Sequence, residues 1–414
     1  MRKTTWWVVG AGAAIGALAF GVTRYLAPAK PVMHAQTAPA VFVAPPPPVA
    51  IPEPPPAPPS SETPTLVEAS EQKIDRRVNA LARELGKMWT RNPDELVVVI
   101  DDAARSTPSS PSVTLLLAIA HAETNGKILD VSEAGAVGLA QTTPVAYRQE
   151  GFDGKVFVTD DYLIGSRAYI VKKPLGDADT IASMVVDRDD AKTRKRAKKL
   201  LRSAKDLRRE GLDELDLLEQ DASPRYFANI RRADRHNREV LNRLDHLLEH
   251  GSRAELRAFR NSVRTEYRSL KQTQLAAWKR YQVELAAKRD RMLEKHFGQN
   301  ATLVKKTMAY EASEYLGEHL DERFSAKKMS TFLVRHLERK TEEARRLAST
   351  GASDAEVEAM TAALYNGGSH NVKRMLAGLI RHLPETETYM KKVPATRRRL
   401  DGVLFGDAGV RTVR

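Results

Sequence analysis

The distribution of proline most constrains how this chain can fold. Fourteen of its 22 prolines lie between Pro28 and Pro64, including an unbroken run of four at 45–48. A segment of this kind cannot form helix ladders or a packed core, and it samples extended polyproline II at about 3.1 Å per residue. We therefore expect residues 28–66 to be a linker, with a reach of roughly 100 Å, ahead of a folded part that begins near Val67.

The segment before the linker is apolar. After Arg2 and Lys3, the stretch Thr4–Thr23 holds no charged residue over twenty positions. As a helix it spans about 30 Å, the thickness of a bilayer's hydrocarbon core. We expect residues 1–27 to anchor the chain in the inner membrane and to place the remainder in the periplasm. A signal peptide cleaved near Ala27-Pro28-Ala29 stays open as the alternative, and it also exports the chain.

Composition limits the possible chemistry. The chain has 414 residues and no cysteine, which excludes disulfides, thiolate metal sites and cysteine nucleophiles. Its 66 Lys and Arg against 53 Asp and Glu give a net charge of +13, which favours an anionic partner such as nucleic acid, a membrane surface or a cell-wall polymer. Export argues against nucleic acid, and the sequence holds no nucleic-acid recognition motif.

Beyond Val67 the apolar residues follow helical spacings, and no run alternates as a strand does, so the sequence predicts an all-α fold. The segment Asp187–Asn300 carries 29 basic against 19 acidic residues. Within it, Val240–Leu248 and Leu256–Leu270 each present one apolar stripe. We expect a helical hairpin with a solvated outer face, while a surface that binds a polyanion or an envelope protein stays open as the alternative.

One carboxylate lies where a catalytic acid is expected. A helix that follows Ser109-Ser110-Pro111 carries the apolar residues Leu116 and Ile119, and Glu123 continues their stripe before Asn125-Gly126 ends the helix. Partial burial and the negative end of the helix dipole both favour the neutral acid, so the sequence predicts a raised pKa for Glu123. The alternative is a helix-end glutamate that turns to solvent.

The surrounding motifs favour the catalytic interpretation. Glu123-Thr124 is followed by Ser132, then by Gly135-Ala-Val-Gly-Leu-Ala-Gln141, and much later by Ala363-Leu-Tyr-Asn-Gly-Gly368 and Pro384-Glu-Thr-Glu-Thr-Tyr389. In this order the motifs resemble those of the lytic transglycosylases of the soluble type, which share a lysozyme-like fold and cleave the glycan strands of peptidoglycan. The resemblance covers about Ser110–Ala146 and Met308–Val393, roughly 120 residues.

The resemblance implies a role for each matching residue. Glu123 is the sole catalytic acid and base, and neither a metal nor an organic cofactor is needed. The implied substrate-binding residues are Thr124, Ser132, Gln141, Tyr365, Asn366, Glu385 and Tyr389. The departures from the family pattern are Thr124 for serine, Ala140 for methionine, and Leu364 and Gly368 for alanines, which put the shape of the sugar subsites in doubt but leave the acid in place.

The domain boundaries depend on where the family's helix between the two motifs falls. Asp161–Tyr169 and Met308–Leu316 both match it in part, and we prefer the second because Tyr315 and Leu316 stand in register. The sequence then predicts a catalytic domain in two parts, 67–150 and 305–396, with a basic helical insertion at 151–304 and a C-terminal tail at 397–414. Besides a lytic transglycosylase, a hydrolytic muramidase and a non-catalytic wall-binding scaffold stay open.

Overall fold

The described part of the chain is helical. The computed structural model describes residues 66–89, 93–106, 111–218, 224–381 and 383–409. Within these ranges no β-strand forms, and only isolated bridges join Val137 to Val131 and to Thr142. The predicted all-α class is confirmed. No helix in these ranges is long and apolar enough to cross a membrane, and the predicted anchor at 1–27 lies outside them, as does the predicted linker up to residue 65.

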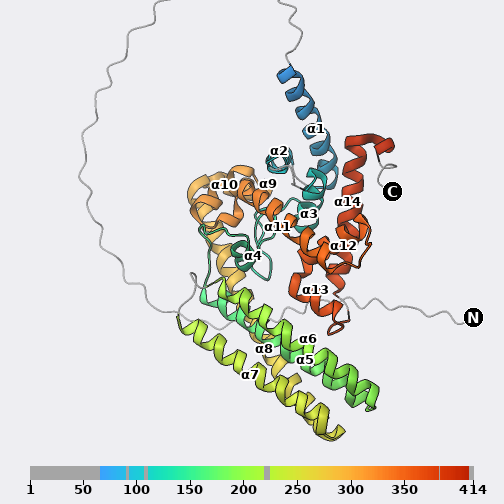
Figure 1. The fold of residues 1–414 in the computed structure, drawn as a ribbon. Coiled ribbons are helices and arrows are strands. Elements are labelled where there is room, and N and C mark those ends of the chain that lie inside the picture. Colours follow the sequence, from blue (N-terminus) through green and yellow to red (C-terminus); the bar gives the residue numbers. More distant parts are fainter. Residues whose placement is uncertain (1–65, 90–92, 107–110, 219–223, 382, 410–414) are drawn as a thin grey trace, which may run out of the picture. The chain divides into compact units, whose positions relative to one another are not determined.

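Figure 1 shows the order of the elements. The α-helices are α1 (Leu66–Met88), α2 (Asp94–Ala104), α3 (Val113–Thr124), α4 (Pro144–Gln149), α5 (Asp160–Asp187), α6 (Ala191–Asp216), α7 (Pro224–His250), α8 (Arg253–Phe297), α9 (Ala301–Thr307), α10 (Tyr310–His319), α11 (Ala326–Leu347), α12 (Asp354–Gly367), α13 (Ser369–Leu376) and α14 (Pro384–Gly409). Two short 3-10 helices are η2 (Gly298–Asn300) and η3 (Glu322–Phe324).

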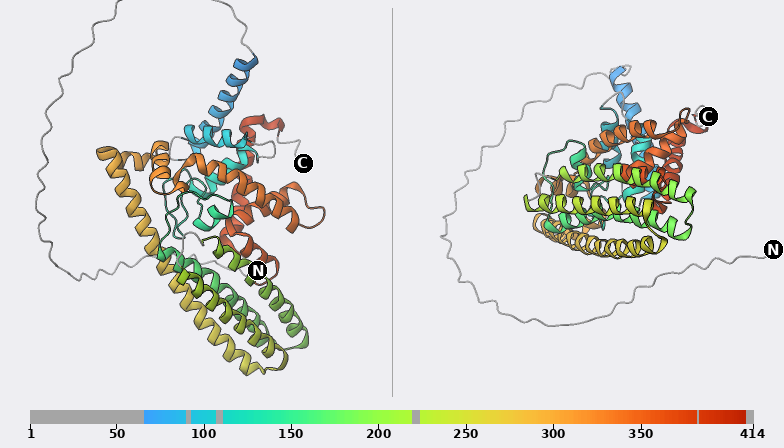
Figure 2. Two further views of the ribbon diagram at one scale, coloured as in Figure 1. Left: turned by 60° about the vertical axis from the view of Figure 1, so that its left-hand side comes forward. Right: turned by 60° about the horizontal axis from the view of Figure 1, so that its bottom comes forward.

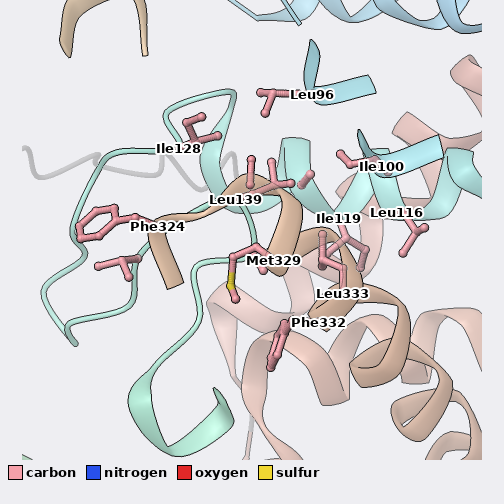
Figure 3. Close-up of a cluster of buried hydrophobic side chains, with 14 of the residues drawn as sticks. Leu96, Ile100, Leu116, Ile119, Ile128, Leu139, Phe324, Met329, Phe332 and Leu333 are labelled. Carbon is pink, nitrogen blue, oxygen red and sulfur yellow. The ribbon is translucent and has the colours of Figure 1, made fainter. Parts of the chain in front are cut away.

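Helix α3 lies at the centre of a first hydrophobic core, which we call the main core. Leu116 and Ile119 of this helix are fully buried, and Figure 3 shows them among side chains from α2, α11 and the loop that follows α3. The helix begins two residues later than the Ser-Pro signal suggests, because the Ser112 hydroxyl accepts the backbone N–H of Leu115 and caps it. Its end agrees with the prediction: Asn125 adopts the left-handed conformation.

The chain's C-terminal helix completes this core. Helix α14 extends through the predicted tail to Gly409, with a kink at Gly406, and Leu400 on it is fully buried in the main core. Arg399 donates to Glu84 of α1 at 2.5 Å, and Thr114 of α3 donates to Asp401 at 2.6 Å. The expectation of a free tail from residue 397 is therefore wrong for residues 397–401, since apolar burial and polar contacts fix them to the folded part.

The basic segment 187–300 folds as the three long helices α6, α7 and α8 rather than as a hairpin, and α5 packs with them. Helices α5, α6, α7 and α8 lie side by side in Figures 1 and 2 and enclose a second core of their own. Both predicted stripes face that core: Leu244 and Leu248 of α7 and Leu256 and Phe259 of α8 are buried. We call this part the four-helix extension.

The extension is continuous with the main core. The first half of α5 and the second half of α8 belong to the main core, through Tyr162, Leu163, Tyr281 and Leu285, while their other halves build the second core. The predicted insertion boundaries, at 151 in the loop after α4 and at 304 within α9, therefore do not coincide with the change of core, which falls within α5 and within α8. A stripe pattern indicates that a helix buries one face, but it does not show that two successive halves of one helix bury it against different partners.

Candidate active site

Glu123 occupies the last turn of α3, and its side chain is half-buried. Burial raises the pKa of its carboxyl to about 7, although the nearby Tyr389 hydroxyl and the Lys392 ammonium act against that shift. Removing water from a carboxyl disfavours its charged form, and the negative end of the helix dipole adds to this effect. Near neutral pH a large fraction of Glu123 therefore holds the proton that a general acid must donate.

The loop 132–142 follows α3 and is closely packed, most tightly at Gly138. Gly138 has a φ of 76°, and a Cβ on it would lie 1.8 Å from the carbonyl oxygen of Arg323, so only glycine permits this approach. Gln141 also has a positive φ, of 44°. Its side-chain amide donates to the carbonyl of Gly138 at 3.2 Å, so Gln141 helps to hold the loop that carries it.

A buried arginine holds this loop from behind. Arg323 in η3 is fully buried, and its guanidinium donates to the carbonyls of Gly135 (3.0 Å) and Thr142 (2.8 Å) and to the hydroxyl of Tyr281 (3.1 Å). Its charge is matched by buried Asp321, at 2.7 Å. Each of these polar groups would otherwise be buried without a partner. The sequence gives no signal for this arrangement, because a lone arginine in a short 3-10 helix belongs to no periodic pattern.

The tyrosine–asparagine motif forms the facing wall. The Tyr365 hydroxyl, in the last turns of α12, donates to the carbonyl of Ala140 at 2.9 Å and so joins segments 225 residues apart in sequence. Burial and the nearby Glu123 carboxyl both raise the pKa of Tyr365. The ring of Tyr389 lies almost parallel to it, with centroids 6.3 Å apart. The structure thus brings the acid, the glycine-rich loop and this wall together.

These elements border an open groove of about 1410 Å³. The predicted site residues that line it are Glu123, Gln141, Tyr365, Asn366 and Glu385. Asn366 and Glu385 are exposed within it, and the amide oxygen of Asn366 accepts a hydrogen bond from Thr386 at 3.0 Å. A groove of this size, edged at this end by the Glu123 carboxyl and several amide and hydroxyl groups, is suited to a polar polymer.

Three predicted substrate-binding residues lie elsewhere. The Thr124 hydroxyl is buried, donating to the carbonyl of Ala120 at 2.9 Å and accepting from the backbone N–H of Gly126 at 3.0 Å, so it closes the end of α3. The Ser132 hydroxyl accepts from the backbone N–H of Ala136 at 2.9 Å and shapes the loop. Tyr389 is buried behind Glu123. The structure places none of these three among the residues that line the groove.

Helix α11 supplies a wall that sequence reasoning missed. Phe332, His336 and Arg339 line the groove from this helix. The Nδ1 atom of His336 lies 2.5 Å from a carboxylate oxygen of Glu150, to which Arg339 also donates, at 2.8 Å. Although burial opposes it, these two partners lower the pKa of Glu150, and burial lowers the pKa of His336 to about 4. The contact with Glu150 thus fixes the His336 ring, which meets the ring of Tyr365 edge-on with the two centroids 5.2 Å apart.

Helix α5 supplies a further wall. Tyr162, Ser166 and Tyr169 line the groove, whereas no residue of α10 does. Our preference for Met308–Leu316 as the helix between the motifs is therefore at odds with the structure. The apolar register that suggested it reflects packing of Leu316 in the main core, and only Asp161–Tyr169 reaches the groove.

No protein-family model, curated protein or solved structure matches this chain significantly. What the site can do is therefore inferred from its own geometry, which offers one carboxyl able to give and take a proton at neutral pH at the edge of a polymer-sized groove.

Proposed function

We propose that this chain is a peptidoglycan lytic transglycosylase with a lysozyme-like catalytic arrangement. It would cleave the β-1,4 bond between N-acetylmuramic acid and N-acetylglucosamine and leave 1,6-anhydro ends. The observation that carries the proposal is the half-buried Glu123, whose pKa of about 7 suits an acid that must also act as a base. Its position against Gln141 and Tyr365, both required by the resemblance, supports it.

The reaction needs one carboxyl in two successive roles. Protonated Glu123 would give its proton to the glycosidic oxygen as the bond to the anomeric carbon breaks through an oxocarbenium-like state. The N-acetyl group of the muramic acid would shield the cation. The Glu123 carboxylate would then take the proton of the 6-hydroxyl, whose oxygen bonds to the anomeric carbon. No water is consumed, and the enzyme returns with Glu123 protonated.

The groove supplies groups that fit sugar hydroxyls and N-acetyl amides. Gln141 and Asn366 each carry an amide that can donate and accept, and Glu385 accepts only. Tyr365 offers a ring face at the groove while its hydroxyl is held by Ala140. Gln141 would have two roles: its side-chain amide holds the loop through Gly138, and the same residue lines the groove where the glycan would bind.

The proposed place of action is the periplasm, with the chain held at the inner membrane by residues 1–27. The proline-rich linker that follows would let the folded part reach a wall that lies away from the membrane. The basic surface of the four-helix extension would favour an anionic wall polymer, and this attraction would weaken as salt is added.

Digestion of purified peptidoglycan sacculi tests the proposal. The full-length chain in detergent is compared with Glu123→Gln and with Glu133→Gln, a matched change at an exposed glutamate of the adjacent loop. We expect the parent and Glu133→Gln to release anhydromuropeptides, identified by mass spectrometry, and Glu123→Gln to release none. Reducing ends in place of anhydro ends would indicate a hydrolytic muramidase. Binding of sacculi without any cleavage by the parent would indicate a scaffold.

A further inference from the structure

The groove continues well past the predicted sugar-binding residues. Beyond Asn366 it runs between α5 and α6 of the four-helix extension on one side and α11 and α13 on the other. Its lining changes there from amides and aromatic rings to charged groups: Lys173, Glu210, Glu214, Lys340, Glu343 and Lys373. We call this part the charged end of the groove.

Lys173 is the most unusual of these groups. It lies on α5, is only 4% exposed, and lines the groove. Its ammonium lies 4.2 Å from the centre of the Tyr169 ring, which also lines the groove. Among the residues that the structure describes, no carboxylate forms a salt bridge or hydrogen bond with this ammonium. The buried carboxylate of Asp177, one turn further along α5, pairs with Arg374, and the charge of Lys173 also acts to lower the pKa of Asp177, which burial raises. A cation at the groove without a salt bridge of its own is suited to an anion that arrives from outside.

Glu214 on α6 is its counterpart. The side chain is half-buried at the groove and forms no salt bridge or hydrogen bond with any other described residue. Burial raises the pKa of Glu214, while the charges of Lys173 and Lys340 act in the opposite direction. Lys173 and Glu214 therefore line the same groove and influence each other, but they form no salt bridge. A cation and a carboxyl group that are not paired with each other fit a ligand that carries both an anionic and a cationic group.

A neighbouring pair shows the contrast. Lys340 is 3% exposed, but its ammonium contacts the hydroxyl of Ser369 and the carboxylate of Glu343, the latter at 3.4 Å. Glu343 also accepts from Ser369 at 2.6 Å and lies 3.7 Å from Lys373. These groups satisfy one another and hold α11 against α13. Lys173 and Glu214 lack such partners, so their charges remain available to a ligand.

We propose that the charged end of the groove is a second subsite that binds the peptide substituent of the glycan, with a peptide carboxylate at Lys173 and a peptide ammonium at Glu214. The inference rests on the proposed function, because it assigns to the same groove a substrate that still carries its peptides. Peptidoglycan stem peptides end in a carboxylate and contain a diamino acid with a free amine when uncrosslinked, so they offer both charges. The four-helix extension would then select peptide-bearing strands over stripped ones.

Two measurements test the subsite: the first measures peptide binding without cleavage, and the second measures how the peptides affect cleavage. The first is calorimetric titration of the stem tetrapeptide, released from sacculi by an amidase, into full-length Glu123→Gln protein. We expect binding that weakens at least tenfold when Lys173→Gln or Glu214→Gln is added, since each removes a charge-assisted contact. Lys173→Arg should retain most of the affinity. Lys195→Gln, which removes an exposed charge on α6, should have no effect.

The second measurement compares cleavage of intact sacculi with cleavage of amidase-stripped glycan strands. The parent should cleave the intact substrate at least several-fold faster, and Lys173→Gln should lose this preference while cleaving stripped strands at the parental rate. Equal rates on both substrates with no peptide binding would overturn the subsite but leave the proposed function standing. Peptide binding that depends on Lys173, without cleavage of either substrate, would support the subsite and reject the enzyme. A Lys173→Gln protein with a parental melting temperature excludes misfolding as the cause.

Discussion

The main core and the four-helix extension are stabilised by different kinds of buried contact. In the extension, long helices bury leucines at three- and four-residue spacings and leave charged side chains outside. In the main core, the loop 132–142 and the 3-10 helix η3 are held by a buried guanidinium and several carbonyls. Regular apolar packing builds a rigid wall, whereas irregular backbone fixed by polar contacts builds the site. Substitutions in each region can test that division of roles.

The largest effect is expected at Glu123. Glu123→Gln removes the only proton donor that the proposal assigns, so cleavage of stripped glycan should fall by about a thousandfold or more, within the range of general acid–base catalysis. The rate of anhydro product formation is the measurement. If Glu123→Gln retains activity, the chemistry does not depend on this carboxyl and the main core has no special catalytic role.

The next effect is expected at the buried arginine. Arg323→Leu would leave Asp321 charged and unpaired and would free two carbonyls of the glycine-rich loop, so the free energy of unfolding should fall by about 3–5 kcal/mol. Chemical denaturation measures this loss. A destabilisation below about 1 kcal/mol would show that apolar packing alone holds the loop, and the contrast between the two regions would not stand.

A smaller effect, and one confined to the extension, is expected at Leu244, which is fully buried between the four helices. Leu244→Ala should lower the free energy of unfolding by about 2–4 kcal/mol through lost apolar burial and the cavity left behind. Because Leu244 is far from Glu123 in the fold's second core, the protein that remains folded should cleave stripped glycan at the parental rate. A large loss of rate would show that the extension does more than support a groove wall.

The smallest effect concerns pH. The folded-state pKa of Glu123 is raised from 4.5 to about 7, so between these values the unfolded chain loses a proton that the folded chain keeps. This group therefore lowers stability as pH rises through that window. Glu123→Gln removes the effect, so its stability relative to the parent should increase by about 2–3 kcal/mol from pH 4.5 to pH 7.5. Thermal unfolding of both proteins at several pH values measures it. For the same reason, parental cleavage should decline as pH rises above about 7, where the acid loses its proton.

Sequence periodicity predicts most of the helices, but it predicts few of the residues that line the groove. The stripes of α7 and α8 and the caps of α3 follow from local rules that act within a few residues. Glu123 is predictable because it continues an apolar stripe at a helix end, and Tyr365 because it stands in a motif that resembles one of the lytic transglycosylases. By contrast, Arg323, His336 and Lys173 belong to contacts between segments far apart in sequence, and no local pattern specifies which distant group each side chain meets.

The insertion boundaries show the same limit. The basic composition of 187–300 marks the extension, but Tyr162 and Tyr169 lie in its first helix and face the groove. A helix that serves two cores has no break in its sequence where one role ends. The predicted boundaries at 151 and 304 therefore lie outside α5 and α8, whereas each of these two helices passes from one core to the other along its own length.

This continuity determines how the folded part can be shortened without loss of the groove. Excision of 151–304 would take Tyr162, Ser166, Tyr169 and Trp278 from the groove together with the distal helices. A usable truncation must instead splice α5 to α8 beyond Tyr169 and before Trp278, with a short turn in place of the outer halves. Such a protein would retain Tyr162, Ser166, Tyr169 and Trp278. It would lose the second core, the main-core residues Leu218, Tyr226 and Ile230, and the charged end of the groove that holds Lys173 and Glu214.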